Sequence, residues 1–272
     1  MRNLKWQMAR LSHHVTWFLG TSFPKSVPLI FVIAYPKSGT TWVCHLVGDY
    51  LRRPFPTGGV LLPVAFPAVV HGHERVWKSY RQGVYVLRDG RDAEISKFIF
   101  YSHSIPEGDH PPMTRQQRRR YPGLFNKANI REHLADFLEG QRTRPIASRA
   151  NWGEHVRSFF NVKNPNVVLL GYEQLIHDGP EALATAMGQL TGEPPDLERA
   201  AEALRRCSFR NQKQLAGAQG RSPKHFFGSG TTGRWKKYFN RRAAELFDRY
   251  WGNELIQAGY ETDHEWVRQC DD

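Results

Sequence analysis

The stretch between residues 37 and 41 carries side chains suited to binding an anion. It consists of Lys37, Ser38, Gly39, Thr40 and Thr41. Lysine supplies a mobile positive charge, the hydroxyls donate hydrogen bonds, and the glycine lets a phosphate group approach the backbone closely. A Walker-type phosphate loop ends Gly-Lys-Ser/Thr instead. Because the lysine precedes the glycine here, the stretch indicates a phosphate-like anion site of a different design, with an ordinary solvated turn as the alternative.

The segments on either side of this stretch predict how it is positioned. Residues 29–34 form a continuous apolar run, typical of a strand buried on both faces of a parallel sheet. Over residues 41–53 apolar side chains recur at helical spacing, and Pro54 follows as a stop signal. The stretch is therefore a strand-to-helix turn, where backbone N–H groups and the helix dipole favour negative charge. Trp42, in the first helical turn, is placed either to stack on a base or to fill the core.

Arg88 and Ser96 form a second pair of candidate anion ligands. An apolar run at residues 84–87 predicts a strand that ends just before Arg88, and a helical pattern over residues 92–100 carries Ser96. Ligands of open α/β sheets bind at the carboxyl ends of the strands. The two side chains could therefore clamp a second phosphate, with bidentate hydrogen bonds from the guanidinium. The alternative for Arg88 is a salt bridge to one of the aspartates that follow it.

Strands alternate with helices along much of the chain. Short apolar runs at residues 68–70 and 167–170 are each followed by polar residues and a helical pattern, which in the second case spans 174–190. We therefore predict an α/β fold in a single domain, with a central parallel sheet flanked by helices and a strand-loop-helix cradle similar to a P-loop. Residues 105–125 are predicted to be a mobile basic insertion, and residues 208–238 a loop that covers the ligand.

The charge and the cysteine content narrow the class of protein. Lys and Arg outnumber Asp and Glu by 38 to 26, for a formal net charge of +12, which indicates an anionic ligand, an acidic acceptor, nucleic acid or a membrane surface. The three cysteines form no Cys-x-x-Cys pair, which argues against structural zinc and for a reducing compartment. The sequence has no signal-peptide pattern and no apolar run long enough to span a bilayer, so we expect a cytoplasmic protein.

Several blocks of the sequence together resemble the cytosolic-type sulfotransferase family. YPKSGTTW at residues 35–42 and VYVLRDGRDAEIS at residues 84–96 resemble the two cofactor signatures of that family. Four further blocks follow in the family's order: residues 151–155, 167–173, 207–209 and 230–239. The resemblance covers roughly residues 28–260. It implies the sulfotransferase fold and the transfer of a sulfuryl group from 3′-phosphoadenosine 5′-phosphosulfate (PAPS) to an acceptor hydroxyl or amine.

The resemblance also implies a role for each candidate residue toward PAPS. The stretch of residues 37–41 would hold the phosphosulfate end, and Trp42 would stack on adenine. Arg88 and Ser96 would bind the 3′-phosphate. The other positions that the family pattern assigns to the nucleotide are Tyr172, Cys207, Phe226, Phe227 and Gly230. Of these, the tyrosine would contact the base edge, the cysteine replaces a threonine of the family, and the two phenylalanines would close over the nucleotide.

The family's catalytic base is a histidine that follows the strand between the two signatures. Aligned on that strand, His73 takes the base position and His71 replaces a lysine of the family pattern. Imidazole is suited to take up the acceptor's proton near neutral pH, and Lys37 would stabilise the charge that builds on the leaving phosphate oxygen. Which of the two histidines is the base stays open. The leaving nucleotide is a stable anion, so no metal is required.

Two pairs of residues depart from the family pattern. Gly228 and Ser229 stand where the family has an Arg-Lys pair that binds the 3′-phosphate. Either other cations replace the pair, or the phosphate is held less tightly, or the cofactor lacks this phosphate. Asn240 and Arg241 stand where the family's dimer signature has Thr-Val, so we expect no dimer of the family type.

Two other classes of function remain open from the sequence. A P-loop nucleotide kinase or NTPase needs Gly-Lys-Ser/Thr and a strand-end aspartate for Mg²⁺, whereas this chain has Arg88 at a strand end. A non-catalytic nucleotide-binding protein would explain the net charge and the missing cation pair. Base-readout motifs are absent from the sequence, so we expect no specific nucleic-acid partner. The acceptor, whether a small molecule, a glycan or a lipid, is not specified by the sequence.

Overall fold

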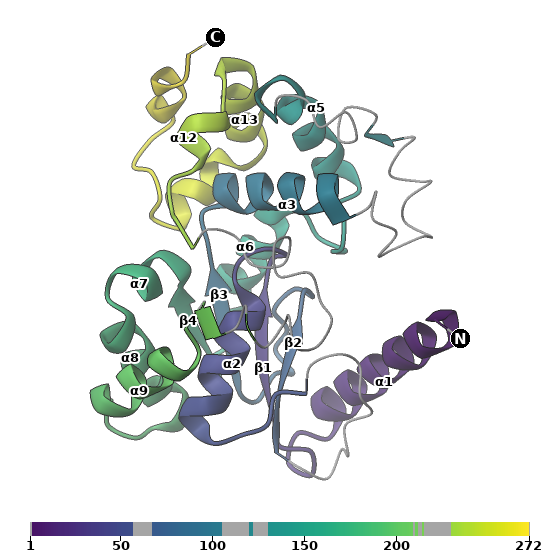
Figure 1. Ribbon diagram of the computed structural model, residues 1–272, viewed down its shortest axis with the longest axis vertical. Coiled ribbons are helices and arrows are strands. Elements are labelled where there is room, and N and C mark those ends of the chain that lie inside the picture. The colour runs from purple at the N-terminus through teal and green to yellow at the C-terminus, as the bar shows by residue number, and fades with distance from the viewer. Residues whose placement is uncertain are drawn as a thin grey trace. The chain divides into compact units, whose positions relative to one another are not determined.

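The computed structural model describes residues 2–56, 67–104, 120–121, 130–208, 210–211, 214 and 230–271. The chain forms two compact units (Figure 1). The first, here called the sheet unit, comprises Met1–Ala34, Gly39–Val86 and Ser158–Ser208. The second, here called the helical unit, comprises Tyr35–Ser38, Leu87–Arg157 and Phe209–Asp272. The candidate anion-binding loop begins in the helical unit and continues into the sheet unit at Gly39.

A four-stranded sheet in the order β2-β1-β3-β4 forms the centre of the sheet unit. Its strands are β1 (Leu29–Ala34), β2 (Ala68–Gly72), β3 (Gly83–Leu87) and β4 (Val167–Gly171). β1 pairs in parallel with β2 and with β3, and all six of its residues are buried. The predictions of an α/β fold and of a parallel sheet with a doubly covered strand before the loop are confirmed.

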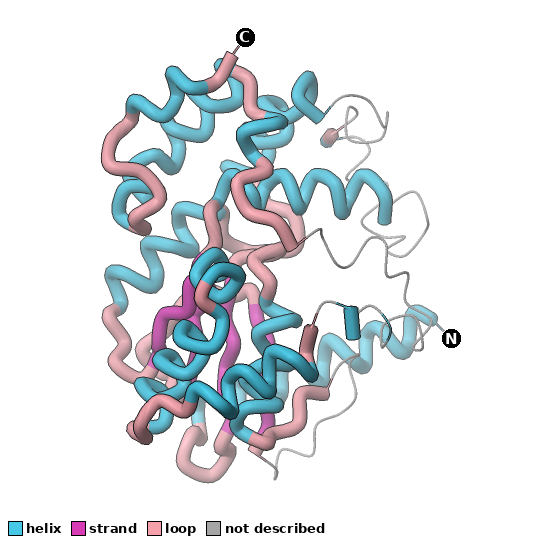
Figure 2. Tube along the Cα trace, turned by 60° about the vertical axis from the view of Figure 1, so that its left-hand side comes forward, coloured by secondary structure: helices cyan, strands magenta, loops and turns pink. Residues whose placement is uncertain are grey.

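Helices cover the sheet and extend along its edges. They are α1 (Arg2–Ser22), α2 (Thr40–Leu51), α7 (Tyr172–His177), α8 (Gly179–Thr191) and α9 (Leu197–Arg206). Figure 1 shows α8 and α9 on the side of β4 and α1 at the opposite edge, beside β2. Figure 2, which draws the strands in magenta, shows helices running along the sheet. The loop of residues 37–41 therefore leads from a buried central strand directly into α2.

One helix predicted from the sequence is two helices in the structure. The pattern over residues 174–190 indicated a continuous helix, but α7 ends at His177 and α8 begins at Gly179. The cause is Pro180, which lies in the first turn of α8. A proline inside a helix lacks the N–H donor and clashes with the carbonyl four residues earlier, so a helix tolerates it only in its first turn.

The helical unit is built around aromatic side chains. Its helices are α3 (Gly90–Ser104), α5 (Ile130–Thr143), α12 (Trp235–Tyr238), α13 (Arg241–Gln257) and the 3-10 turn η2 (Glu265–Gln269). α6 (Trp152–Val162) begins in this unit and ends in the sheet unit. One cluster of buried rings here consists of Trp152, Trp235, Phe239, Phe247, Trp251 and Trp266. Within the described part of the chain, no helix is long and apolar enough to cross a membrane.

Two segments singled out from the sequence lie mostly outside the described residues. Of residues 105–125 the structure describes 120–121, and of residues 208–238 it describes mainly 230–238. Tyr121 is buried, and its hydroxyl accepts a hydrogen bond from Gln141 Nε2 at 3.0 Å. The mobile insertion and the ligand-covering loop therefore stay predictions.

Candidate anion-binding site

Lys37 adopts a left-handed backbone conformation at the start of the candidate loop. Its φ is 71°, in a region that residues other than glycine seldom occupy, at a cost of roughly 1–3 kcal/mol. Arg88 stabilises this conformation, because its Nη1 donates a hydrogen bond of 2.8 Å to the Lys37 carbonyl oxygen. Both residues belong to the helical unit. The structure thus brings together the lysine of the loop and the strand-end arginine.

The Lys37 side chain extends over an aromatic ring. Its ammonium nitrogen lies 4.0 Å from the ring centroid of Phe100, within the range of a cation–π contact. Burial, together with the positive charge of Arg88, lowers the pKa of Lys37 from 10.5 to about 8. A bound anion would act in the opposite direction, because it offsets positive charge and accepts hydrogen bonds from the ammonium. The lysine is therefore suited to bind an anion near neutral pH.

Two hydroxyls of the loop are buried and lack a hydrogen-bond partner among the described residues. They are Ser38 Oγ and Thr40 Oγ1, in residues that are 1% and 4% exposed. Buried polar groups are nearly always hydrogen-bonded, because leaving one unpaired costs about 1–3 kcal/mol. These hydroxyls fit a ligand with several acceptor oxygens, such as a phosphate or a sulfate group. Thr41, the next residue of the loop, is half-buried in the first turn of α2.

Any residue other than glycine would be strained at position 39, because of its backbone conformation and because of a close neighbouring ring. Gly39 has a left-handed φ of 87°, and a Cβ atom added to it would lie 2.7 Å from the ring of Tyr172. Tyr172 is buried and begins α7 directly after β4. The glycine of the loop and the tyrosine that follows β4 are therefore packed against each other in the sheet unit.

Trp42 lies in the core of the sheet unit. Its Nε1–H donates a hydrogen bond of 2.9 Å to the backbone carbonyl oxygen of Cys207, and its ring meets that of Tyr172 edge-on with 6.1 Å between centroids. Cys207 is buried, and this burial raises the pKa of its thiol from 9.0 to about 11. Three of the residues assigned to the nucleotide thus form one cluster. The stacking of Trp42 on a base stays a prediction.

His73 follows β2 and is oriented by the last residue of β1. Its Nδ1 lies 2.8 Å from the backbone carbonyl oxygen of Ala34. A carbonyl oxygen only accepts hydrogen bonds, so in the neutral imidazole Nδ1 carries the proton and Nε2 carries the lone pair. His71 is exposed on β2, with 5.8 Å between the two ring centroids. His73 is therefore held in the tautomer in which Nε2 is the basic atom.

Asp89 is one of the two aspartates that could form a salt bridge with Arg88. It forms an ion pair with Arg91, at 2.8 Å between Oδ2 and Nη2. The backbone carbonyl of Arg88 accepts a hydrogen bond of 3.2 Å from Trp152 Nε1, which fixes the end of β3 against α6. Ser96 is half-buried in the second turn of α3, in the same unit.

Asp92 anchors the glycine-rich segment near the C-terminus of the chain. Its carboxylate accepts hydrogen bonds from the backbone N–H groups of Gly233 and Trp235, at 2.7 and 2.8 Å. Gly230 and Gly233 both have left-handed backbones, with φ of 69° and 71°. The segment that the family pattern assigns to the nucleotide is therefore tied to the N-terminus of α3. Phe226, Phe227, Gly228 and Ser229 lie outside the described residues.

A buried polar network that the sequence analysis missed lies next to the loop in the helical unit. Tyr35 donates a hydrogen bond of 2.5 Å to Glu94 Oε1 and accepts one of 2.6 Å from Lys97 Nζ. Lys97 also donates to Gln141 Oε1 at 2.7 Å. The side chains of Glu94 and Lys97 are fully buried and 3.9 Å apart. Burial raises the pKa of Glu94 and lowers the pKa of Lys97 to about 8. The feature of the sequence that could have indicated this network is a glutamate and a lysine three residues apart, Glu94 and Lys97, in one helix.

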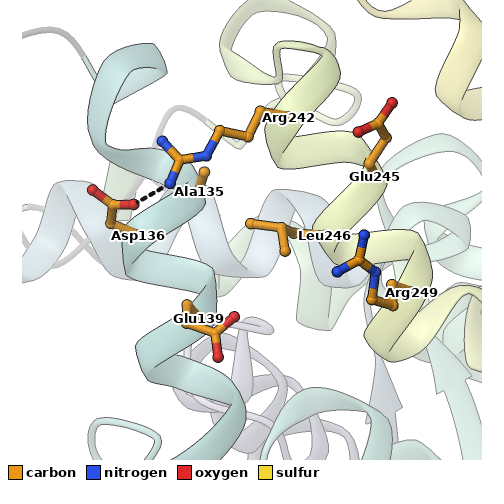
Figure 3. Close-up of a pocket in the computed structure, with 7 residues that line it drawn as sticks. All are labelled: Ala135, Asp136, Glu139, Arg242, Glu245, Leu246 and Arg249. Carbon is orange, nitrogen blue, oxygen red and sulfur yellow. Dashed lines mark hydrogen bonds and ion pairs between the residues drawn. The ribbon is translucent and has the colours of Figure 1, made fainter.

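A separate pocket in the helical unit carries none of the expected site residues. It has a volume of about 240 Å³ and lies between α5 and α13 (Figure 3). Its lining consists of Ala135, Asp136, Glu139, Arg242, Glu245, Leu246 and Arg249. Acidic and basic groups alternate around it, and Arg242 pairs with Asp136 at 2.7 Å. Such mixed charge is typical of a solvated seam between helices and does not favour an anionic ligand.

The fold and the site are typical of α/β proteins that bind phosphate-like groups. The central strand β1 leads into a loop with a left-handed lysine, a left-handed glycine and two buried hydroxyls, and α2 follows directly. Such loops bind phosphate-like groups in α/β proteins. Residues 67–259 match the family described as the Sulfotransferase domain. This match spans more than half of the chain, so the chain belongs to the sulfotransferase domain family.

Curated relatives resemble the chain over most of its length. The 3-alpha-hydroxysteroid sulfotransferase of Cavia porcellus is 25% identical over an alignment 303 positions long, which covers 92% of this chain and 96% of the relative. Sulfotransferase 1E1 of Homo sapiens is 25% identical over an alignment 272 positions long, which covers 84% of each chain. Each relative carries the sulfotransferase name, and the chain spans most of the length of both. The prediction of the cytosolic-type sulfotransferase family is confirmed.

Solved structures share the fold. Mouse sulfotransferase SULT7A1, complexed with 3′-phosphoadenosine 5′-phosphate (PAP), has a TM-score of 0.59 at 19% identity, with 88% of this chain and 87% of that chain covered. Retinol dehydratase, in complex with androsterone and the inactive cofactor PAP, has a TM-score of 0.58 at 19% identity, with 84% and 80% covered. These structures establish the sulfotransferase fold of the chain.

Proposed function

We propose that the chain transfers a sulfuryl group from PAPS to the hydroxyl or amine of a small-molecule acceptor. The observation that carries the proposal is the loop of residues 37–41. Its hydroxyls at Ser38 and Thr40 are buried and lack a partner within the described residues, and the chain belongs to a sulfotransferase family. Two solved relatives of the same fold are described with PAP, the nucleotide that remains after PAPS gives up its sulfuryl group.

The loop binds the phosphosulfate end of PAPS. Ser38 and Thr40 donate hydrogen bonds to its oxygens, and the N–H groups at the start of α2 add the positive end of the helix dipole. Lys37 supplies a positive charge. Burial lowers its pKa to about 8, so the ammonium is still mostly protonated near neutral pH. Gly39 lets the loop backbone pack closely against Tyr172, because a Cβ at this position would lie 2.7 Å from the tyrosine ring.

Arg88 and Ser96 bind the 3′-phosphate in this proposal. Arg88 is 7% exposed, and one of its Nη atoms already fixes the Lys37 carbonyl. The same side chain therefore links the two phosphate-binding positions of the helical unit. Because Gly228 and Ser229 replace the cation pair of the family pattern, Arg88 carries a larger share of the binding of this phosphate than the family pattern implies.

His73 is the general base, and the transfer is a single in-line displacement. The acceptor oxygen attacks sulfur while its proton passes to His73 Nε2, the atom left basic by the hydrogen bond at Nδ1. The bond between sulfur and the bridging phosphate oxygen breaks, and its electron pair stays on that oxygen. Such transfers pass through a loose transition state, so catalysis rests on positioning and on charge stabilisation. Lys37 stabilises the charge that builds on the leaving oxygen.

The acceptor is a small molecule, and the site of action is the cytoplasm. The curated relatives include an enzyme named for hydroxysteroids, and one solved relative is described with androsterone. An apolar alcohol is accordingly the first acceptor class to test. The described cysteines, Cys44, Cys207 and Cys270, are free and buried, which agrees with a reducing compartment.

An equilibrium titration with PAP tests the donor site. With EDTA present, PAP should bind more tightly than ATP with Mg²⁺, and Lys37→Ala should weaken PAP binding by at least ~10-fold, the scale of one charge-assisted contact. Lys163→Ala is the matched control, because Lys163 is also a left-handed lysine, with φ of 47°, but is exposed. ATP binding that requires Mg²⁺, with no binding of PAP, would favour the kinase alternative and end this proposal.

A further inference from the structure

The N-terminal helix α1 has its polar and apolar sides reversed. Its buried side carries Ser12 and Thr16, each 6% exposed, followed by the buried Gly20. Its outer side carries Leu11 at 67%, Val15 at 44% and Phe18 at 61% exposure. A helix on the surface of a globular protein normally buries its apolar side chains and exposes its polar ones. α1 therefore presents an apolar stripe outward for a reason other than the packing of the fold.

The contacts of α1 fix this orientation. The ring of Trp17 packs edge-on against Phe31 at 4.7 Å and against Tyr80 at 5.6 Å between centroids. A Cβ atom added to Gly20 would lie 2.6 Å from a methyl group of Leu29, so the helix approaches β1 closely at that point. Rotating the helix to bury the apolar stripe would break these contacts. The outward stripe is consequently a fixed feature of the sheet unit.

The stripe of Leu11, Val15 and Phe18 spans about two helical turns. Leu11, Val15 and Phe18 are spaced by four and three residues, which places them on one side of a helix. In the sequence, Leu4 and Met8 continue the same spacing toward the N-terminus. Phe23, just after the helix, is 53% exposed. No described helix is long and apolar enough to cross a membrane, so the stripe suits a helix that lies along an interface.

The charge of this part of the chain determines which partner fits the stripe. The first acidic residue of the sequence is Asp49, whereas Arg2, Lys5, Arg10 and Lys25 are all basic. An apolar helix side flanked by basic residues binds anionic lipid surfaces by burying apolar area and by electrostatic attraction. Pairing with α1 of a second copy would instead bring two positively charged helices together without a compensating acidic residue. The charges thus favour a bilayer over a dimer.

We infer that α1 docks the protein on an anionic bilayer surface. Leu11, Val15 and Phe18 insert at the boundary between headgroups and acyl chains, and the positive charge of this segment attracts acidic lipids such as phosphatidylserine. The helix lies in the plane of the surface and does not span it. This inference rests on α1 alone and holds whether or not the sulfuryl transfer proposed above is correct.

Vesicle flotation of the full chain tests the inference. Phosphatidylcholine vesicles are compared with vesicles in which about a quarter of the lipid is phosphatidylserine. The anionic vesicles should bind the protein at least ~10-fold more tightly. The double variant Leu11→Ser/Phe18→Ser should lower this binding by at least ~10-fold, because both apolar insertions are lost. A triple variant Arg2→Gln/Lys5→Gln/Arg10→Gln should bind both kinds of vesicle about equally.

The matched control is Leu169→Ser/Leu197→Ser. These two leucines are 40% and 50% exposed in the same unit, and their replacement should leave vesicle binding unchanged. Thermal unfolding of every variant checks that the fold is retained. The inference is overturned if the native protein does not float with anionic vesicles, or if the control loses as much binding as the stripe variant. It is also overturned if ultracentrifugation without lipid finds a dimer that Leu11→Ser/Phe18→Ser abolishes, because the stripe then faces a second copy.

Discussion

At the scale of single residues, Lys37 combines a strained backbone with a shifted pKa. Its left-handed φ of 71° turns its carbonyl to Arg88, and its ammonium lies over Phe100. Strain of this kind persists only where the surroundings fix it, and it concentrates at functional sites. The family resemblance implies that Lys37 is a ligand of the donor. Its conformation and its environment could not be read from the sequence, because both depend on residues far along the chain.

The lowered pKa of Lys37 predicts a pH dependence of nucleotide binding. The charged lysine binds the anion, and the bound anion raises its pKa again, so PAP affinity should be highest below pH 8 and fall as the pH rises through about 8. Between about pH 7 and about pH 9.5 the dissociation constant should increase by ~10-fold or more. Titration calorimetry in buffers of different ionisation enthalpy should detect proton uptake on binding near the upper pH.

Lys37→Arg is the control for this pH dependence. Arginine stays charged throughout this range, so the variant should bind PAP with little change between the two pH values. An unchanged slope in Lys37→Arg would assign the titration to another group and contradict the role given to the lysine.

Because His73 Nε2 is the basic atom, replacing this histidine should slow turnover without weakening nucleotide binding. His73→Ala should lower kcat by at least ~10²-fold, the scale of one general base, and should leave PAP affinity nearly unchanged. His71→Ala is the comparison, because its ring lies 5.8 Å away on the same strand end. If His71→Ala loses the activity and His73→Ala retains it, the base has been assigned to the wrong histidine.

At the scale of elements, α3 organises the helical unit around the loop. Asp92 holds the glycine-rich segment through two backbone N–H groups. Glu94 and Lys97, about one turn apart on the same helix, both form hydrogen bonds with the hydroxyl of Tyr35, which lies two residues before the loop. The chain direction of β1 and β3, the loop and the start of this helix were predictable from apolar runs and turn residues. The network was not, because its partners join residues from three separate segments.

The buried network predicts a large loss of stability when it is broken on one side. Lys97→Met should lower the free energy of unfolding by about 3–5 kcal/mol, because it leaves the Glu94 carboxyl buried without its cation. The double variant Glu94→Gln/Lys97→Met removes both charges, so it should recover part of this loss. Urea unfolding of the two variants and of Glu94→Gln measures the coupling between the pair.

The exposed pair Arg242–Asp136 provides the matched control for this coupling. Both side chains are about two-thirds exposed, at 66% and 67%, and exposed ion pairs contribute little. Asp136→Asn should therefore change the stability much less than Lys97→Met. Equal losses at the two pairs would show that burial does not set the strength of the network.

At the scale of the whole molecule, the chain belongs to the sulfotransferase domain family. Two of its features bear on the proposals above. The first is the replacement of the family's cation pair by Gly228 and Ser229. The second is α1, whose apolar side faces outward. The blocks shared with the family made the fold and the donor predictable from the sequence. The outward apolar side of α1 was not predictable, because residue spacing shows which side chains share a side of a helix but not which side faces the core. The division of the 174–190 helix at Pro180 was not predicted either.

The most direct test of the account is sulfuryl transfer itself. The purified chain is incubated with PAPS and a panel of apolar alcohols and amines in the presence of EDTA, and sulfated product and PAP are quantified by mass spectrometry. The account predicts equal amounts of PAP and sulfated acceptor for at least one compound, with His73→Ala slower by at least ~10²-fold. Tight binding of PAP without transfer to any acceptor, or transfer that His73→Ala leaves unchanged, would contradict it.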